Sequence, residues 1–230
     1  MLSKLQNGHR RRLKVACGAL ALLVLLGVIG IGFSGPSGSV SDPPPGQTSF
    51  REEEDVITRM SSQVQDADAR TKTDATDPAA WAALATARVR FAQVGKNFDA
   101  AANNYTARGR RQLTAAGTAW DQYIGLDPSA PDERLARSMT QVFLALEQPA
   151  KAVRAWEIIV ELEPAANTYT NLALLAYQAG QVRKGDRAST KAQELTEDAD
   201  EKKVLKQQLE QVKSQAAVQE LAPTPTPTIG

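Results

Sequence analysis

The sequence predicts an all-α protein: a solenoid of antiparallel helix pairs closed by a capping helix and preceded by one transmembrane helix. The first observation is a repeated phrase. Residues 119–128 and 155–164, which start 36 positions apart, both read Ala-Trp-acid-x-x-apolar-x-Leu-acid-Pro. A period of this size is typical of stacked helical repeats. The second is apolar spacing of helical period over residues 50–221, with no strand pattern anywhere. The third is an uncharged apolar run at residues 15–33.

Composition narrows the classes of function. The formal net charge is +1, but five of the 27 basic residues lie within residues 1–14, where there is no acid. The rest of the chain therefore has 22 basic and 26 acidic residues, and this mildly acidic body argues against nucleic-acid binding. The single cysteine, Cys17, excludes an internal disulfide.

The run at residues 15–33 has the length of a membrane span, because its residues would cover roughly 28 Å as a helix. The basic residues 1–14 precede it, so the positive-inside rule keeps them in the cytoplasm and places the remaining chain outside. The alternative is a cleaved signal peptide. The run exceeds the usual signal-peptide core and no Ala-x-Ala site follows it, which favours an uncleaved anchor.

Residues 34–49 are rich in Pro, Gly and Ser, and they are expected to be an extended linker. The helical domain is expected at 50–221. Its first helix begins near Ser49, with a stripe of Val56, Ile57, Met60 and Val64 and with glutamates 52–54 in the first turn.

The second helix is predicted to start at Asp77-Pro78, with Asp77 as N-cap and Pro78 as the first helical residue. It fades near Gly95. Residues 98–111 combine helical spacing with helix-breaking Asn and Gly. Two interpretations of this segment remain: an insertion, or a long connection between two helices. A clear helix is predicted at 113–126.

Five further helices are predicted. One starts at residue 131, one spans 152–162, one ends at Gly180, and the last two span 181–195 and 198–221. The last has one apolar stripe and a polar outer side, as a capping helix requires. A two-stranded coiled coil is the alternative for this helix. Residues 222–230 are Pro- and Thr-rich and are expected to be a disordered tail.

The paired helices and the phrase ending in Leu-acid-Pro resemble the tetratricopeptide repeat, best over units 133–164 and 166–197 and less well before them. An earlier unit is split by an excess of residues at 94–111. The residues that carry the resemblance are expected to pack the stack together; they are Trp81, Leu84, Trp120, Pro128, Ala152, Trp156, Pro164, Leu172, Gly180 and Ala192.

The resemblance implies a groove, lined by the first helix of each unit, that binds a peptide or a partner helix. Transferring the groove positions to this sequence gives Arg90, Arg134, Arg137, Gln141, Asn167, Thr170, Tyr177 and Gln178. The two arginines near residue 135 would suit a carboxylate on the partner.

Chemistry-bearing motifs are scarce. The sequence has no phosphate-binding glycine loop and no Cys/His metal spacing, and no histidine follows His9. We therefore expect that the protein is not an enzyme and that it binds no cofactor, no metal and no small-molecule substrate. The expected function is that of a membrane-anchored scaffold or adaptor for other proteins, outside the cytoplasmic membrane. The alternative is an envelope chaperone or a cytochrome-c-maturation accessory that holds unfolded clients.

Overall fold

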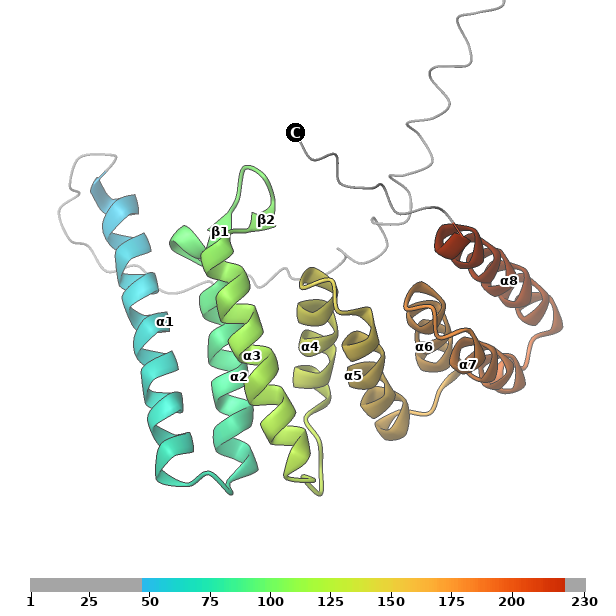
Figure 1. Ribbon diagram of the computed structural model, residues 1–230, viewed down its shortest axis with the longest axis horizontal. Helices are drawn as coiled ribbons and strands as arrows, with labels where there is room; N and C mark the ends of the chain where they lie inside the picture. The colour runs from blue at the N-terminus through green and yellow to red at the C-terminus, as the bar shows by residue number, and fades with distance from the viewer. Residues whose placement is uncertain (1–46, 222–230) are drawn as a thin grey trace, which may run out of the picture. The chain divides into compact units, whose positions relative to one another are not determined.

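The computed structural model describes residues 47–221, with side chains described over 52–218. This part of the chain contains eight α-helices, one 3₁₀ helix and two very short strands. The all-α prediction is confirmed, although the expectation that no strand would occur is wrong at one connection. Figure 1 shows the helices following one another in chain order, with α2 beside α3, α4 beside α5 and α6 beside α7.

The first helix, α1 (Gln47–Thr73), begins within the stretch expected to be linker, so that linker ends at residue 46. The glutamates at 52–54 consequently lie beyond the first turn instead of in it. All four residues of the predicted stripe are half-buried, and Val64 among them packs against the core. Ala67, one turn further along, is buried within the core. This stripe packs α1 against α2.

Helix α2 (Pro78–Ala92) starts as predicted. The Asp77 side chain accepts a hydrogen bond from the Ala79 N–H at 2.8 Å, and Pro78 is the first helical residue. Its alanines allow α1 and α3 to approach closely, since a small side chain keeps two helix backbones near each other. Leu84, predicted as a packing residue, is buried.

The ambiguous stretch contains a short hairpin. A 3₁₀ helix (Gly95–Asn97) leads into β1 (Phe98–Asp99), which pairs antiparallel with β2 (Asn104–Tyr105). The rings of Phe98 and Tyr105 meet edge to face, with centroids 5.2 Å apart. Helix α3 (Ala107–Gly125) then starts six residues earlier than residue 113, capped by Thr106, whose hydroxyl accepts from the Gly109 N–H.

The next two pairs are regular. Helix α4 (Glu133–Ala145) pairs with α5 (Pro149–Leu162), and α6 (Ala166–Gln178) pairs with α7 (Val182–Leu195). The two turns between partners use a left-handed backbone at equivalent positions, with φ of 59° at Glu147 and 68° at Gly180. Gly180 thus lies in the turn after α6, at the place where the sequence predicts this helix to end.

The last helix, α8 (Ala199–Leu221), packs mainly on α6, the place that the first helix of another pair would occupy. Its Leu209 is buried, while Leu205, Val212 and Ala216 pack at the edge of the core. Helix α8 therefore covers one side of α6 with its apolar stripe.

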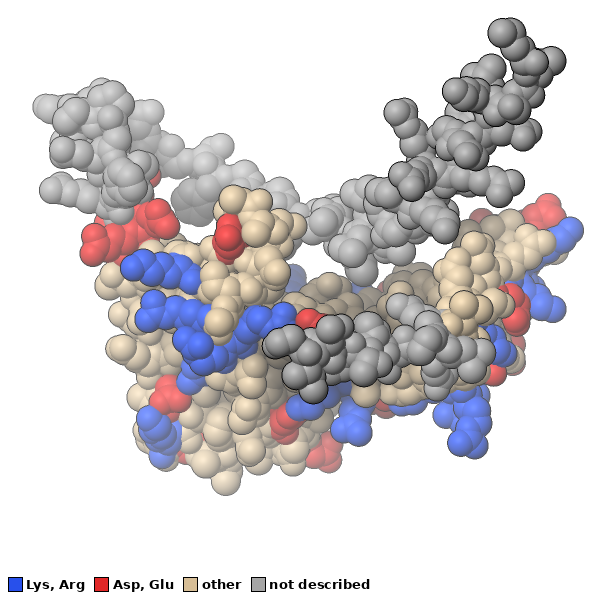
Figure 2. All heavy atoms as spheres, turned by 45° about the horizontal axis from the view of Figure 1, so that its top comes forward, with Lys and Arg blue, Asp and Glu red and all other residues tan. Residues whose placement is uncertain are grey.

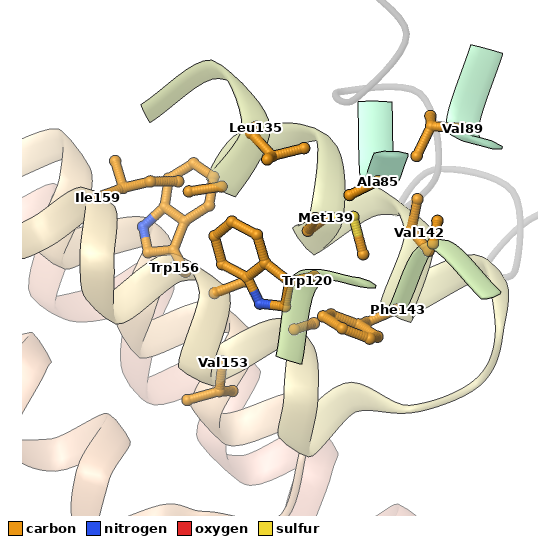
Figure 3. Close-up of a cluster of buried hydrophobic side chains, with 14 of the residues drawn as sticks. Ala85, Val89, Trp120, Leu135, Met139, Val142, Phe143, Val153, Trp156 and Ile159 are labelled. Atoms are coloured by element: carbon orange, nitrogen blue, oxygen red, sulfur yellow. The ribbon is translucent and has the colours of Figure 1, made fainter. Parts of the chain in front are cut away.

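One continuous core runs through the helices. Figure 3 shows side chains of α2, α3, α4 and α5 gathered around Trp120. Trp120 and Trp156, which occupy the same place in the two copies of the phrase, are 4% and 8% exposed. Gly117 lets the Phe143 ring lie close to α3, because a Cβ there would stand 3.1 Å from that ring.

No helix among residues 47–221 is long and apolar enough to cross a bilayer. The predicted span at 15–33, the basic residues 1–14 and the tail at 222–230 lie outside the described residues.

Candidate partner-binding face

Three helices, α2, α4 and α6, hold the residues predicted to meet a partner. Counting from the first residue of each helix places Arg134 level with Asn167, Arg137 level with Thr170, and Arg90 level with Gln178. Residues three, four or seven apart share one side of a helix, so Arg134, Arg137 and Gln141 form one strip on α4. We call these residues together with Arg90, Asn167, Thr170 and Gln178 the partner face.

Four members of the partner face are exposed and free within the described residues. Arg90, Arg134, Gln141 and Gln178 make no ion pair and no side-chain hydrogen bond to any residue of this part of the chain. Among residues 52–218, their donors and acceptors therefore meet no other side chain. Two further members are partly engaged: the Asn167 side chain accepts from the Thr168 N–H, and the Thr170 hydroxyl donates to the Ala166 carbonyl.

Arg137 is held in place by its own molecule. Its guanidinium pairs with Glu133 at 2.6 Å and with Glu163 at 3.1 Å, and it lies over the Trp156 ring at 5.4 Å from the centroid. An incoming carboxylate would have to compete with both glutamates. Arg134, one turn earlier, has no such partner in the described residues and is the better candidate for meeting an acidic group.

Tyr177 does not belong to the face. It is only 2% exposed, and its hydroxyl donates to Asp186 Oδ1 at 2.9 Å. Burial, followed by the adjoining Asp186 carboxylate, raises the pKa of Tyr177 above its usual value. Asp186 in turn pairs with Lys213 of α8 at 2.7 Å, and this ammonium holds the pKa of Asp186 below its usual value. The prediction placed Tyr177 on the face because helical spacing within α6 does not show what covers the side chain. It is covered by α7, where Gly185 lies against the tyrosine ring.

Of the ten residues predicted to hold the stack together, Pro164 and Gly180 are exposed, and the other eight are buried or half-buried. Trp156 donates its indole N–H to the Thr168 carbonyl at 2.9 Å, which joins α5 to α6. In the other copy of the phrase this link is made by Tyr123, whose hydroxyl accepts from the Asp132 N–H at the start of α4. Ala152, Leu172 and Ala192 are buried, and Trp81 is half-buried and donates to the Ala75 carbonyl.

The two prolines that end the copies occupy different turns. Pro128 follows Asp127, which has a left-handed φ of 50°, whereas Pro164 follows Glu163, whose φ is −131°. Pro164 is exposed and Pro128 is half-buried. The same phrase therefore closes two different connections.

Two surface depressions lie along α7. One is lined by Gly180, Gln181, Arg183 and Arg187 at the start of the helix, and another by Asp186, Thr190 and Glu194 further along. Both are open to solvent. Across residues 47–221 no three His, Cys, Asp or Glu side chains gather in a way that could hold a metal ion.

A charged region that the sequence reasoning missed lies around the hairpin. Figure 2 shows Lys and Arg side chains gathered on the α1–α3 part of the molecule beneath it. Residues 88–111 contain six basic residues and one acid, and a scan of local charge along the sequence would have revealed this imbalance.

Comparison of the sequence with known protein families gives no match, and neither does comparison with curated proteins.

Proposed function

We propose that the protein is a single-pass membrane protein that displays a tetratricopeptide-type array outside the cytoplasmic membrane and uses it as a scaffold or adaptor for other proteins. The observation that carries this proposal is the partner face. Four exposed polar side chains at related positions of α2, α4 and α6 have no partner within residues 52–218. An array that presents unsatisfied donors on one side suits the binding of a polar protein segment.

The repeat architecture is supported by spacing. From α4 to α6 and from α6 to α8, equivalent helices start 33 residues apart, at 133, 166 and 199. The second helix of each pair has a small buried residue at the equivalent position: Ala116, Ala152 and Gly185. Small residues at this position allow close helix pairing, and each pair then stacks on the next.

The anchor is supported by the uncharged run at 15–33 and the five basic residues before it. Residues 34–46 separate this run from the start of α1.

Topology is tested by protease protection on sealed membranes. With the cytoplasmic side enclosed, added protease should digest residues 50–220 and leave residues 1–14 protected. Protection of the helical domain would overturn the proposed orientation.

Partner binding is tested with photocrosslinking side chains in intact membranes. We expect crosslinks to another protein from positions 134 and 141 on the partner face. Positions 118 and 190, exposed threonines on α3 and α7, serve as matched controls and should give far fewer. Equal crosslinking from both sets would contradict the assignment of the face.

An aggregation assay with a denatured model client distinguishes a scaffold from a holding chaperone. A holdase exposes apolar side chains to its clients, but the partner face is polar, with Leu174 as a half-buried neighbour. We therefore expect the protein to leave the aggregation of a denatured model client unchanged. Suppression at equal molar ratio would favour the chaperone function.

A further inference from the structure

A basic surface lies where α3 begins, beside the hairpin. Its members are Lys96, Arg108 and Arg111. The Thr106 hydroxyl, which caps α3, also donates to the Lys96 carbonyl at 2.8 Å, so Lys96 lies next to the first turn of α3. Arg108 and Arg111 are three residues apart and share one side of that helix.

The three cations of the basic surface are unused. All are exposed, and none has an ion-pair partner within residues 52–218. The neighbouring arginines differ: Arg88 pairs with Asp68, and Arg110 binds Glu147 and the Ala145 carbonyl. The start of α3 adds the positive end of a helix dipole.

Within residues 52–218, the acid of the hairpin forms no ion pair with these three cations. Asp99 Oδ1 accepts from the backbone N–H groups of Ala101 and Ala102, so its carboxylate is committed to the hairpin turn. The basic surface therefore presents three positive charges to whatever approaches the hairpin.

The same chain carries the opposite charge at the same end of the molecule. Residues 52–55 of α1 are Glu, Glu, Glu and Asp, all exposed and all without an ion pair in the described part of the chain. We call them the acidic segment. A Cβ on Gly95 would lie 2.5 Å from Ile57, which places α1 just beyond the acidic segment against the residue before Lys96. No ion pair joins the two sets within one molecule of the described chain.

We propose that the basic surface of one copy binds the acidic segment of a second copy, and the reverse, in a twofold dimer. Each copy supplies both halves of the contact, as a closed twofold interface requires. Both sets of charge are then neutralised together. The inference rests on the proposed anchor in one respect: two copies held in one membrane present these ends at the same height.

Charge favours a second copy over an anionic lipid surface. An anionic membrane would attract the three cations but repel four acids carried at the same end of the molecule. A copy of the chain meets both sets with the opposite sign. The dimer should therefore weaken as salt screens exposed charges.

The first test is zero-length crosslinking of the full chain in vesicles made from a zwitterionic lipid. Copies labelled with ¹⁴N and ¹⁵N are mixed and treated with a carbodiimide, which joins an amine to a carboxylate. We expect mixed-isotope peptides that join Lys96 to residues 52–55. Peptides of one isotope only would show that the contact forms within a molecule and would overturn the proposal.

The second test is energy transfer between labelled full-length copies in the same vesicles. R108E/R111E should lower the association about fivefold, E53R/E54R should do the same, and the two changes combined should restore it, since exposed ion pairs depend on sign. R154E/R187E is the matched control: both arginines are exposed on α5 and α7 without an ion pair in the described residues, and association should be unchanged.

Two outcomes of the second test also contradict the dimer. One is failure of the combined charge swap to restore association when each variant keeps the helical circular dichroism of the parent. The other is association that appears only with anionic lipid, which would assign the basic surface to the membrane. Neither outcome affects the protease-protection or photocrosslinking results, so the proposed scaffold function is judged separately.

Discussion

Single small residues decide how closely the helices of a pair approach. Ala116, Ala152 and Gly185 occupy the same position in the three pairs, and all are buried. Only the third must be glycine, because Tyr177 lies across it: a Cβ on Gly185 would stand 2.4 Å from the tyrosine ring. Tyr177 is fully enclosed and cannot move away without giving up its bond to Asp186.

We therefore predict that Gly185→Ala destabilises the protein by about 1–3 kcal/mol, the usual cost of overpacking. The measurement is urea unfolding followed by circular dichroism. Gly125→Ala is the matched control, since that residue ends α3 with nothing within 4 Å of an added Cβ. The control should be neutral or slightly stabilising. An equal loss of unfolding free energy in the two variants would contradict the proposed clash.

A second prediction concerns the turns between paired helices. Glu147 has φ of 59° where the next pair has Gly180 with φ of 68°. A side chain in this conformation costs roughly 1 kcal/mol that glycine avoids. Glu147→Gly should raise the free energy of unfolding by about 0.5–1 kcal/mol, and Gly180→Ala should lower it by about 1 kcal/mol. The exposed ion pair of Glu147 with Arg110 opposes the gain only weakly.

Among the helices, α8 is held against α6 and α7 by a series of polar contacts as well as by its apolar stripe. Tyr177 of α6 donates to Asp186 of α7, and Asp186 pairs with Lys213 of α8. Lys213 and the Tyr177 hydroxyl both stabilise the ionised form of Asp186, so its pKa is lowered. The pKa of Lys213 is raised by the same pair.

This arrangement predicts how the attachment of α8 depends on pH. Because the folded pKa of Asp186 lies below its unfolded value, its contribution is complete above the unfolded pKa. It is lost as pH falls below about 4 through the folded pKa. At neutral pH, Asp186→Asn should raise hydrogen exchange in α8, at a cost of about 1 kcal/mol or less because the pair is partly exposed. Asp121→Asn, which removes an ion pair between α3 and α5, should leave α8 unchanged.

The connection between α2 and α3 differs from the other connections between paired helices, because it contains a hairpin where the other two pairs have a short turn. The paired strands, the Phe98–Tyr105 contact and the cap at Thr106 make it an ordered addition to the first pair. Asn97 lies at its base, where its backbone carbonyl accepts from the Thr106 N–H at 3.0 Å. Gly109 is required there, since a Cβ would lie 2.0 Å from that carbonyl.

At the scale of the molecule, each helix pair contacts mainly its neighbours in the chain. In such an array stability is close to a sum of units and the contacts between them. The end pair thus depends on α8, whose Leu209 is buried against it.

We predict that a chain ending at residue 197 loses protection unevenly. Removing the buried Leu209 should destabilise α6 and α7 by at least about 2 kcal/mol, as loss of one core leucine does elsewhere. Exchange in α1, α2 and α3 should change little. Hydrogen exchange with mass spectrometry resolves these segments, and a uniform loss of protection over all helices would contradict the array description.

The sequence by itself determined the helices and most of their ends. Apolar spacing and capping residues act within one or two turns, so Asp77, Pro78 and Gly180 could be assigned without any tertiary information. The same local reasoning failed at residues 98–111, because the strand pairing there depends on residues that meet only after the chain turns back. It also placed the start of α3 too late.

The tertiary structure alone decided which polar residues are free to bind. Arg134 and Gln141 remain exposed, as the sequence predicted. Arg137, by contrast, is engaged by Glu133 of its own helix and by Glu163, which follows α5, and Tyr177 is enclosed by α7. It also brought Lys96 next to Thr106, the cap of α3, across the hairpin. Helical period says which side of a helix a residue occupies. What covers that side depends on contacts between distant parts of the chain, and the period carries no information about them.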